Sequence, residues 1–236
     1  NKTTFVTNNA IKDKWLLEGH QAGAAGVYRW FRDEITQLEA AYAHASERDV
    51  YQLTNTLVEK TPVGAKGLIF LPYLAGAATP RWNPEARGSL VGLTFAHDRG
   101  CVARAFMEGI TMDMRDLLQS MINSGVEISN VRILGGPTKS PLWNQIQADI
   151  YKRPVGTLKH TDAAVVGAAI IAGFGVGVFD SIAEGVKLMV LPDEKYEPIE
   201  KNAIIYDELY DIFCNLYKGL NEQNVFSDLA KLQEKY

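Results

Sequence analysis

The chain has 236 residues, of which 47% are hydrophobic and 22% are charged, and its formal net charge is −4. These values are ordinary for a globular domain, and the lack of a basic tract argues against nucleic acid and anionic membranes as partners. Two cysteines, Cys101 and Cys214, are too few for a disulfide scaffold, so we expect both to be reduced and buried.

The first half of the chain predicts both strands and helices. Its predicted elements are two short strands, two helices, a third strand, a long loop and a stretch that is either β-like or irregular, at residues 4–7, 13–18, 24–45, 48–60, 67–73, 74–87 and 88–95. Asn8-Asn9 is a turn signal between the first two strands, and apolar residues recur at helical spacing in both helices. The third strand is apolar almost throughout, which predicts that both of its faces are buried.

The second half predicts six elements, the first of which is a long helix. In order they are a helix, a strand, a helix, a strand and two more helices, at residues 100–123, 131–134, 141–151, 154–158, 163–179 and 202–220. The segment 163–179 begins after Asp162, an N-cap candidate. It lies at the short limit for a membrane span, so we expect a buried helix. Residues 221–236 are polar and are expected to fray, and together the elements predict one α/β domain with a central sheet flanked by helices.

The most informative stretch joins a strand to a helix through two glycines. Gly135 and Gly136 follow the strand, and Ser140-Pro141 suits the N-cap and the first position of the next helix. Glycines let another group approach the backbone closely, and free N–H groups at a helix N-terminus attract phosphate. Two interpretations stay open on these residues alone. One is a nucleotide cradle with Lys139 near a phosphate, and the other is an ordinary strand–helix turn with a solvated lysine.

Other catalytic signatures are missing from the sequence. It has no Gly-x-Ser-x-Gly elbow, no phosphate-loop motif and no dinucleotide-binding Gly-x-Gly-x-x-Gly. The histidines are scattered and lack a partner at metal-ligand spacing; they are His20, His44, His97 and His160. The aspartates that we interpret as helix caps or solvated charges are Asp98, Asp113, Asp149 and Asp162. None of them is nominated as a catalytic base.

Four blocks, taken together, carry a specific signal. They are Ala22–Trp30, Pro72–Gly88 with the helix motif Arg104-Ala105 and Glu108-Gly109 that follows, Gly135–Asp149, and Ala163–Gly173. In this order they resemble the C-terminal half of the FGGY carbohydrate kinases, and within that family the xylulokinase-like branch. The resemblance spans about residues 15–220. Each block alone would be a weak signal.

The resemblance implies an actin/hexokinase-like ATPase lobe with a ribonuclease-H-like α/β fold. It also implies transfer of the γ-phosphoryl group of ATP, bound with Mg²⁺ between two lobes, to a hydroxyl of a sugar or polyol. By motif position, the backbone of Gly136 contacts the nucleotide and the Ser140 side chain contacts its adenosine end. The nucleotide-binding residues expected from the matched blocks are Gly135, Gly136, Lys139, Ser140, Ala25, Gly26 and Arg29.

A few positions depart from the family pattern. Pro137 stands where a small residue is usual, and it removes a backbone donor. Ala25 replaces a frequent glycine, and Phe106 is bulkier than the usual residue. These departures leave the fold assignment in place and leave the sugar open.

Family members are longer than this chain. We therefore expect residues 1–236 to be a single C-terminal nucleotide-binding lobe that lacks its first hairpin and the whole N-terminal sugar-binding lobe. Asn1 is not methionine, which fits a processed product or a fragment. The catalytic base would lie in the missing lobe, so the chain alone is expected to be inactive.

Two hypotheses follow for the function. In the first, the chain is the nucleotide-binding part of a pentulose kinase, with xylulose as the first candidate and gluconate or another sugar or polyol as the alternative. In the second, it is a stand-alone actin-like module that binds nucleotide or a partner and catalyses nothing. The first hypothesis predicts ATP and Mg²⁺ as cofactors, ATP or ADP and a sugar as partners, a homodimer as the candidate assembly, and a cytoplasmic location.

Overall fold

The computed structural model describes residues 4–236, which contain both helices and strands. The strands form three small sheets. They are β1 (Phe5–Asn8) with β2 (Trp15–Glu18), β3 (Ile69–Leu71) with β4 (Ser89–Val91), and β5 (Val131–Arg132) with β6 (Val155–Leu158) and β7 (Pro192–Tyr196). β5 and β6 are parallel, and the other pairs are antiparallel. The α/β class is confirmed, with the strands divided among three sheets.

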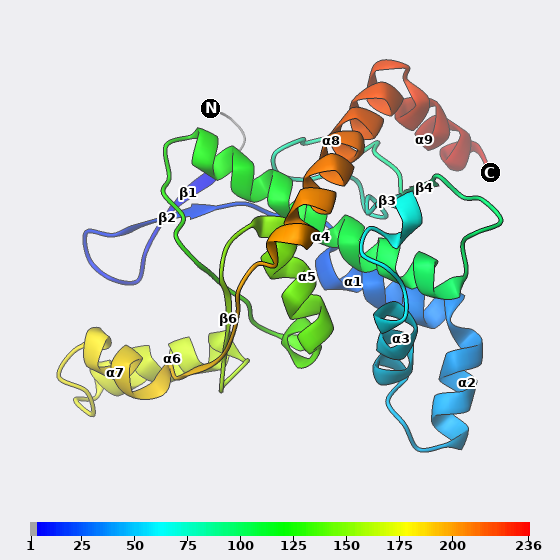
Figure 1. Cartoon of the computed structure of the whole chain (residues 1–236). Coiled ribbons are helices and arrows are strands. Elements are labelled where there is room, and N and C mark those ends of the chain that lie inside the picture. The colour runs from blue at the N-terminus through cyan, green and yellow to red at the C-terminus, as the bar shows by residue number, and fades with distance from the viewer. Residues whose placement is uncertain (1–3) are drawn as a thin grey trace.

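The helices surround one long central helix. They are α1 (Ala24–Trp30), α2 (Gln37–Ala45), α3 (Val50–Glu59), α4 (Arg99–Asn123), α5 (Pro141–Tyr151), α6 (Ala163–Gly175), α7 (Ile182–Met189), α8 (Glu200–Glu222) and α9 (Val225–Lys235). α4 runs through the middle of the molecule, and α1, α3, α5 and α8 pack against it (Figure 1). The predicted long helix at residues 100–123 is therefore confirmed, and four other helices pack directly against it.

The core lies where α4 crosses β3. The rings of Phe70 on β3 and Phe106 on α4 stack with their centroids 3.7 Å apart, and Phe31 packs on Phe106 at 4.5 Å. Gly109 follows one helical turn after Phe106, and a Cβ atom there would come within 2.1 Å of the Phe70 carbonyl oxygen. Because only glycine allows so close an approach, Gly109 sets the distance between α4 and the strand.

A buried ion pair ties three segments together beside this core. Arg104 Nε donates to Glu108 Oε1 at 2.6 Å. The same oxygen accepts from Gly64 N at 3.0 Å and from Tyr206 Oη at 2.7 Å. Burial raises the pKa of Glu108, and the Arg104 guanidinium offsets part of that rise. The pair joins α4 to α8 and to the turn before β3, and its buried charges are hydrogen-bonded as such charges must be.

Side-chain caps begin several helices, two of them at the N-caps that the sequence predicts. Ser140 accepts from the Trp143 backbone N–H and caps α5, and Asp162 accepts from the Val165 N–H and caps α6, at 3.2 Å in both cases. Asp98 caps α4 in the same way. These short-range contacts satisfy donors that the helix itself leaves free, which explains why the sequence predicts the helix starts well.

Two other aspartates are buried tertiary contacts, so their interpretation as caps or solvated charges was wrong. Asp113 on α4 accepts from Gln21 Nε2 at 2.9 Å, and burial raises its pKa to about 6. Asp149 on α5 accepts from Ile199 N at 2.7 Å and from Asn202 Nδ2 at 2.8 Å, which ties α5 to the start of α8. The sequence pattern does not reveal these contacts because the partners are far apart in the chain.

Three segments differ from the sequence prediction in their secondary structure. The predicted helix at 24–45 is divided into α1, a π-helical turn (Phe31–Ile35) and α2. The elements α7 and β7 were not predicted at all. The C-terminal residues, which we expected to fray, contain α9, on which Phe226 and Ala230 are buried and which packs against α8.

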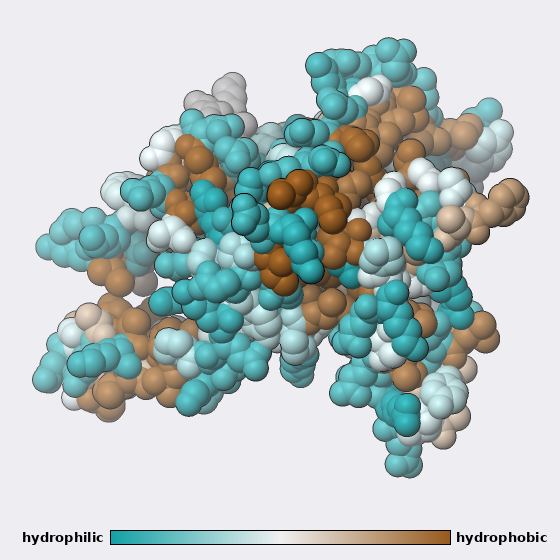
Figure 2. Space-filling model, in the orientation of Figure 1, coloured by the Kyte–Doolittle hydropathy of each residue, from teal (hydrophilic) through white to brown (hydrophobic). Residues whose placement is uncertain are grey.

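The apolar helix α6 is exposed, so the prediction that it is buried was wrong. Ile170 is its one buried residue. The exposed apolar side chains on α6 and just after it are Val165, Ile171, Phe174, Val176 and Val178. α6 packs on α7, and the pair projects at the lower left of Figure 1, where Figure 2 shows hydrophobic surface. Within residues 4–236, no helix combines the length and apolarity needed to cross a membrane.

Candidate functional site

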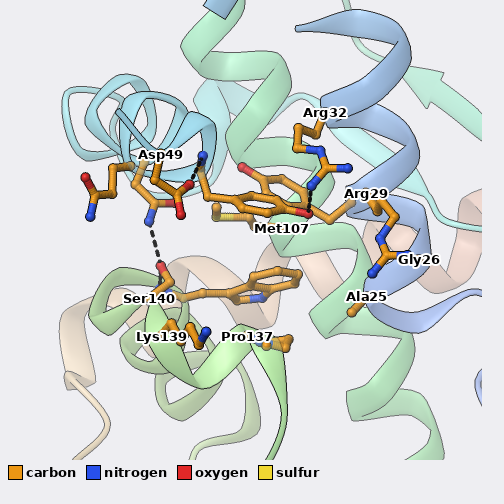
Figure 3. A pocket seen from close by; sticks show the side chains of 15 residues that line it. Ala25, Gly26, Arg29, Arg32, Asp49, Met107, Pro137, Lys139 and Ser140 are labelled. Carbon is orange, nitrogen blue, oxygen red and sulfur yellow. Dashed lines mark hydrogen bonds between the residues drawn. The ribbon is translucent and has the colours of Figure 1, made fainter. Parts of the chain in front are cut away.

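A cavity of about 660 Å³ lies between α1, α3, α4 and the turn before α5 (Figure 3). Its volume is within the usual range for small-molecule sites. Its lining residues are Ala25, Gly26, Tyr28, Arg29, Arg32, Asp49, Tyr51, Gln52, Asn55, Met107, Gly136, Pro137, Lys139, Ser140 and Trp143. Segments that are distant in the sequence therefore meet at one concave surface.

The glycine turn forms one edge of the cavity. Gly135 has φ +81°, a conformation that favours glycine, and the short 3₁₀-helix η3 (Gly136–Lys139) follows it. Thr138 Oγ1 donates to the Gly135 carbonyl oxygen at 2.6 Å, and Asn144 Nδ2 donates to the Thr138 carbonyl oxygen at 3.0 Å. A Cβ atom at Gly136 would have nothing within 4 Å. Packing inside the protein therefore does not require glycine at Gly136, and the space beside its backbone is open to a ligand.

The Ser140 hydroxyl has a proton that is free to donate a hydrogen bond. Its oxygen accepts from the Trp143 backbone N–H at 3.2 Å and from Asn55 Nδ2 at 3.1 Å. A hydroxyl has two acceptor positions and one donor, so both acceptor positions are used and the proton is left to donate. The Asn55 bond also joins α3 to the start of α5 across the cavity (Figure 3).

Three aromatic residues contribute to the walls, namely Tyr28, Tyr51 and Trp143. Tyr28 lies between Trp143 and Tyr51, with ring centroids 5.0 Å and 6.1 Å away. Trp143 Nε1 donates to Thr111 Oγ1 on α4 at 3.0 Å, which fixes the indole. Burial raises the pKa of Tyr28, so its hydroxyl stays neutral at any physiological pH. The rings offer a rigid apolar surface of the kind on which planar ligands pack.

The charges of the site are arranged unevenly. Arg29 and Lys139 are exposed on the cavity, and within residues 4–236 no ion pair or hydrogen bond engages either side chain. Arg32 is already engaged, because Nη1 donates to Tyr51 Oη at 2.9 Å and Nη2 pairs with Asp33 at 2.6 Å. Asp49 lies away from Arg29, on the other side of the view in Figure 3, and its carboxylate caps α3. The cavity therefore has two free cations and one acidic group set apart from Arg29.

The structure brings together six of the seven residues that the sequence nominates. Gly136, Lys139, Ser140, Ala25, Gly26 and Arg29 line the cavity, and Gly135 precedes it as the hinge of the turn. Sequence reasoning missed the aromatic walls and the polar residues of α3. Tyr28 follows Ala25 by three positions and Trp143 follows Ser140 by three, so helical spacing could have found them. Asn55 gave no such signal, because it reaches the cavity only through the packing of α3.

The site offers little to a metal ion. Over residues 4–236, no group of three or more histidine, cysteine, aspartate or glutamate side chains could hold one. Asp49 is the single carboxylate among the lining residues, and it is engaged as a helix cap. A magnesium ion at this cavity would have to be bound largely by the phosphates of a ligand, which is its usual arrangement with nucleotides. The cysteines are free thiols, with Cys101 buried and Cys214 half-buried.

Comparison with known proteins identifies the chain's relatives. The profile for the C-terminal domain of the FGGY family of carbohydrate kinases matches residues 2–176. Xylulose kinase of Bacillus subtilis is 35% identical over 217 residues, which are 92% of this chain and 42% of that protein. Gluconokinase of the same organism is 30% identical over 226 residues, 95% of this chain and 44% of that protein. The chain thus spans about two fifths of the length of the curated relatives that it matches.

The solved structures agree with the sequence relatives. The crystal structure of xylulose kinase from Rhodospirillum rubrum superposes with a TM-score of 0.82 and 27% identity, over 96% of this chain and 44% of that one. This likeness confirms the expected fold, in which the small sheets and the central helix belong to an ATPase lobe of the FGGY kinase type. The chain belongs to the FGGY family of carbohydrate kinases, on its xylulokinase-like branch.

Proposed function

We propose that the 660 Å³ cavity binds ATP and that the chain is the nucleotide-binding lobe of a sugar kinase. The observation that carries this proposal is the open space beside Gly136, where a Cβ atom would meet nothing within 4 Å. Glycine is required there neither by packing nor by a positive φ. A ligand that packs directly against the backbone would explain why this position is a glycine.

The positions of the charged side chains indicate which end of the cavity holds the phosphates and which end holds the base. Arg29 supplies a free guanidinium at the cavity that Gly136 and Pro137 also line, and such a group binds phosphate oxygens in a forked geometry. Asp49 would repel phosphate where it lies, apart from Arg29. We therefore place the phosphates near Gly136 and Arg29, with Lys139 as a second point charge. The base lies toward the Ser140 hydroxyl and Asn55, where the free proton of Ser140 can donate to a ring nitrogen.

The reaction proposed is transfer of the γ-phosphoryl group of ATP to a hydroxyl of a pentulose, with xylulose as the first candidate. The relatives named xylulose kinase support it. Gluconate is the alternative, because a gluconokinase matches 95% of the chain at 30% identity. In this chain, the aromatic walls exclude water from the nucleotide and Arg29 offsets the charge of its phosphates. The sugar pocket and the proton acceptor belong to a part of the enzyme outside this chain, and magnesium would arrive bound to the phosphates.

The test is calorimetric titration with ADP and with ATP. Gly136→Val should weaken binding at least about tenfold, because the added side chain fills the space that the phosphates need. Gly219→Val is the matched control: Gly219 lies on α8, and a Cβ atom there also meets nothing within 4 Å. It should leave binding unchanged. If the wild-type protein binds neither nucleotide, or if both variants bind as well as wild type, the proposal is wrong.

A further inference from the structure

A second cavity, of about 300 Å³, lies at the far ends of α4 and α5. Three of its lining residues are cationic: Arg115 on α4, and Lys152 and Arg153 just after α5. The cavity shares no lining residue with the first one. At 1.5 Å per residue, the length of α5 separates Ser140 from Lys152 by about 18 Å. The second cavity is therefore a different place on the molecule.

The cations outnumber the acidic groups that face them. Arg115 Nη2 pairs with Asp207 Oδ1 at 2.6 Å, and Lys152 Nζ pairs with the other oxygen of the same carboxylate at 2.7 Å. Arg153 Nε donates to the Ile128 carbonyl oxygen at 2.8 Å, and no ion pair engages Arg153 in the part of the chain that the structure describes. Burial alone would raise the pKa of Asp207, but Lys152 and Arg115 hold it below its usual value, so the carboxylate stays charged. Three positive charges against one negative charge leave an excess of two.

Many donors also remain unused. A lysine has three N–H donors and an arginine has five, and each of the three side chains uses one of them in the contacts just described. The Arg115 guanidinium lies over the Tyr210 ring, with its central carbon 4.2 Å from the ring centroid, which holds the plane of its donors. Fixed guanidinium planes and a neighbouring ammonium suit the tetrahedral oxygens of a phosphate group.

The backbone of Lys152 gives an independent observation. Its φ is +54° and its ψ is 38°, at the C-cap of α5. Glycine is the usual residue in this left-handed conformation at a helix end, because a side chain is strained there. A lysine at such a position keeps a charge at the cavity in spite of the strain. The same conformation makes Lys152→Gly a substitution that relaxes the backbone while it removes the charge.

We propose that this second cavity binds a small phosphate-bearing anion, either inorganic phosphate or a phosphate monoester such as a sugar phosphate. The excess of two positive charges matches a phosphate dianion. Arg153 and the unused donors of Lys152 hold the phosphate, while Asp207 keeps Arg115 and Lys152 in place from the other side. A purely structural role would have Lys152 and Arg153 only offset the partial negative charge at the C-terminus of α5. That role predicts no preference for phosphate over chloride.

The experiment is a calorimetric and thermal-melting titration of the full-length protein, free of nucleotide, at constant ionic strength. The probes are inorganic phosphate, ribose 5-phosphate and chloride. Lys152→Gly and Arg153→Gln should each weaken phosphate binding at least about tenfold. Lys152→Gly should not lower the melting temperature without ligand, because glycine is relaxed in the left-handed conformation. Loss of binding in this variant therefore cannot come from unfolding.

Two control variants show whether phosphate binds at the second cavity. Lys66 also has a left-handed backbone, with φ +57° and ψ 32°, and it lines neither cavity. Lys66→Gly should bind phosphate as wild type does. Arg29→Gln removes a free cation from the first cavity, so this variant loses any phosphate bound there and keeps the phosphate bound at the second cavity. Tighter binding of ribose 5-phosphate would identify a phosphorylated metabolite as the ligand, and equal binding would identify the phosphate group alone. The proposal is overturned if phosphate acts no differently from chloride, if Lys152→Gly and Arg153→Gln bind as wild type, or if Arg29→Gln abolishes the effect.

Discussion

Helices α5 and α6 begin with the same kind of N-cap but differ in burial, since α5 is mostly buried and α6 is mostly exposed. Each starts with a side-chain cap, Ser140 or Asp162, at 3.2 Å from the backbone N–H that it accepts. Eight residues of α5 are buried, including the polar Asn144, Gln147 and Asp149, whereas α6 has only Ile170. Yet α6 is made almost entirely of apolar and small residues. The comparison teaches that burial is decided by the neighbours of a helix and only loosely by its composition.

The neighbours explain the difference. α5 packs against α4, α8 and β6, and its buried polar groups find partners there, such as Asp149 with Ile199 and Asn202. α6 has α7 as its main contact. A broad apolar surface of this kind is typical of a site where another protein segment packs. In the region that carries the candidate site, the buried faces are covered by other parts of this chain. In the α6–α7 region, much of the apolar surface is not covered by this chain.

The sharpest test of this contrast compares one isoleucine from each helix. Ile150 on α5 is fully buried at 0% exposure, and Ile171 on α6 is 49% exposed. Ile150→Ala should lower the free energy of unfolding by about 2–5 kcal/mol, since it removes packed methyl groups and leaves a cavity. Ile171→Ala should cost less than about 1 kcal/mol. Urea unfolding of both variants measures the difference, and equal losses would show that α6 is covered in solution.

The buried centre should also respond to pH through Asp113. Burial raises its pKa to about 6, against 3.8 in the unfolded chain, so between these values the folded state binds the extra proton. The contribution of Asp113 to stability is therefore fully present below about pH 4 and is lost as the pH rises through 6. A shift of this size corresponds to about 3 kcal/mol at most.

The variant Asp113→Asn isolates this effect. Asparagine does not titrate, and its oxygen can still accept the hydrogen bond from Gln21 Nε2. Relative to wild type, the variant should gain stability between pH 4 and 6, and its advantage should then stay constant at higher pH. Urea unfolding at pH 4 to 8 provides the measurement. A difference that does not change with pH would contradict the buried, titrating Asp113.

The two helix caps give the smallest contrast. Ser140→Ala should lower the free energy of unfolding by about 1–2 kcal/mol, because it removes the cap of α5 and leaves Asn55 Nδ2 without its partner. Asp162→Ala should cost about 0.5–1 kcal/mol, because its cap is exposed and water can replace it. Thermal melting of the two variants is sufficient. A larger loss for Asp162→Ala would mean that α6 is held more firmly than its contacts indicate.

The sequence predicts features that depend on neighbouring residues. It misses features that depend on contacts between distant segments. The helix starts at Ser140 and Asp162 follow from residues within a turn of each other. The division of the helix predicted at 24–45 and the exposure of α6 depend on contacts made elsewhere. The pairing of β7 with β6 was missed because the partner strands are far apart in the chain and β7 is mostly exposed.

The candidate site shows the same division. Four residues that the sequence predicts from blocks resembling a family line the cavity: Gly136, Ser140, Ala25 and Arg29. The residues of α3 were not found, although Asn55 bonds directly to Ser140. They reach the cavity because α3 packs on α4, which no local pattern encodes. Spacing along the chain can add Tyr28 and Trp143 to a prediction, and only the folded chain adds Asn55.

The most direct test of the central claim is a crystal structure of the full-length protein with a non-hydrolysable ATP analogue. The account predicts that the analogue occupies the cavity between α1, α3 and η3. Its phosphates should lie beside Gly136 and Arg29, and its base should lie within hydrogen-bond distance of the Ser140 hydroxyl. An analogue bound elsewhere, or one with its phosphates beside Asp49, would contradict the account.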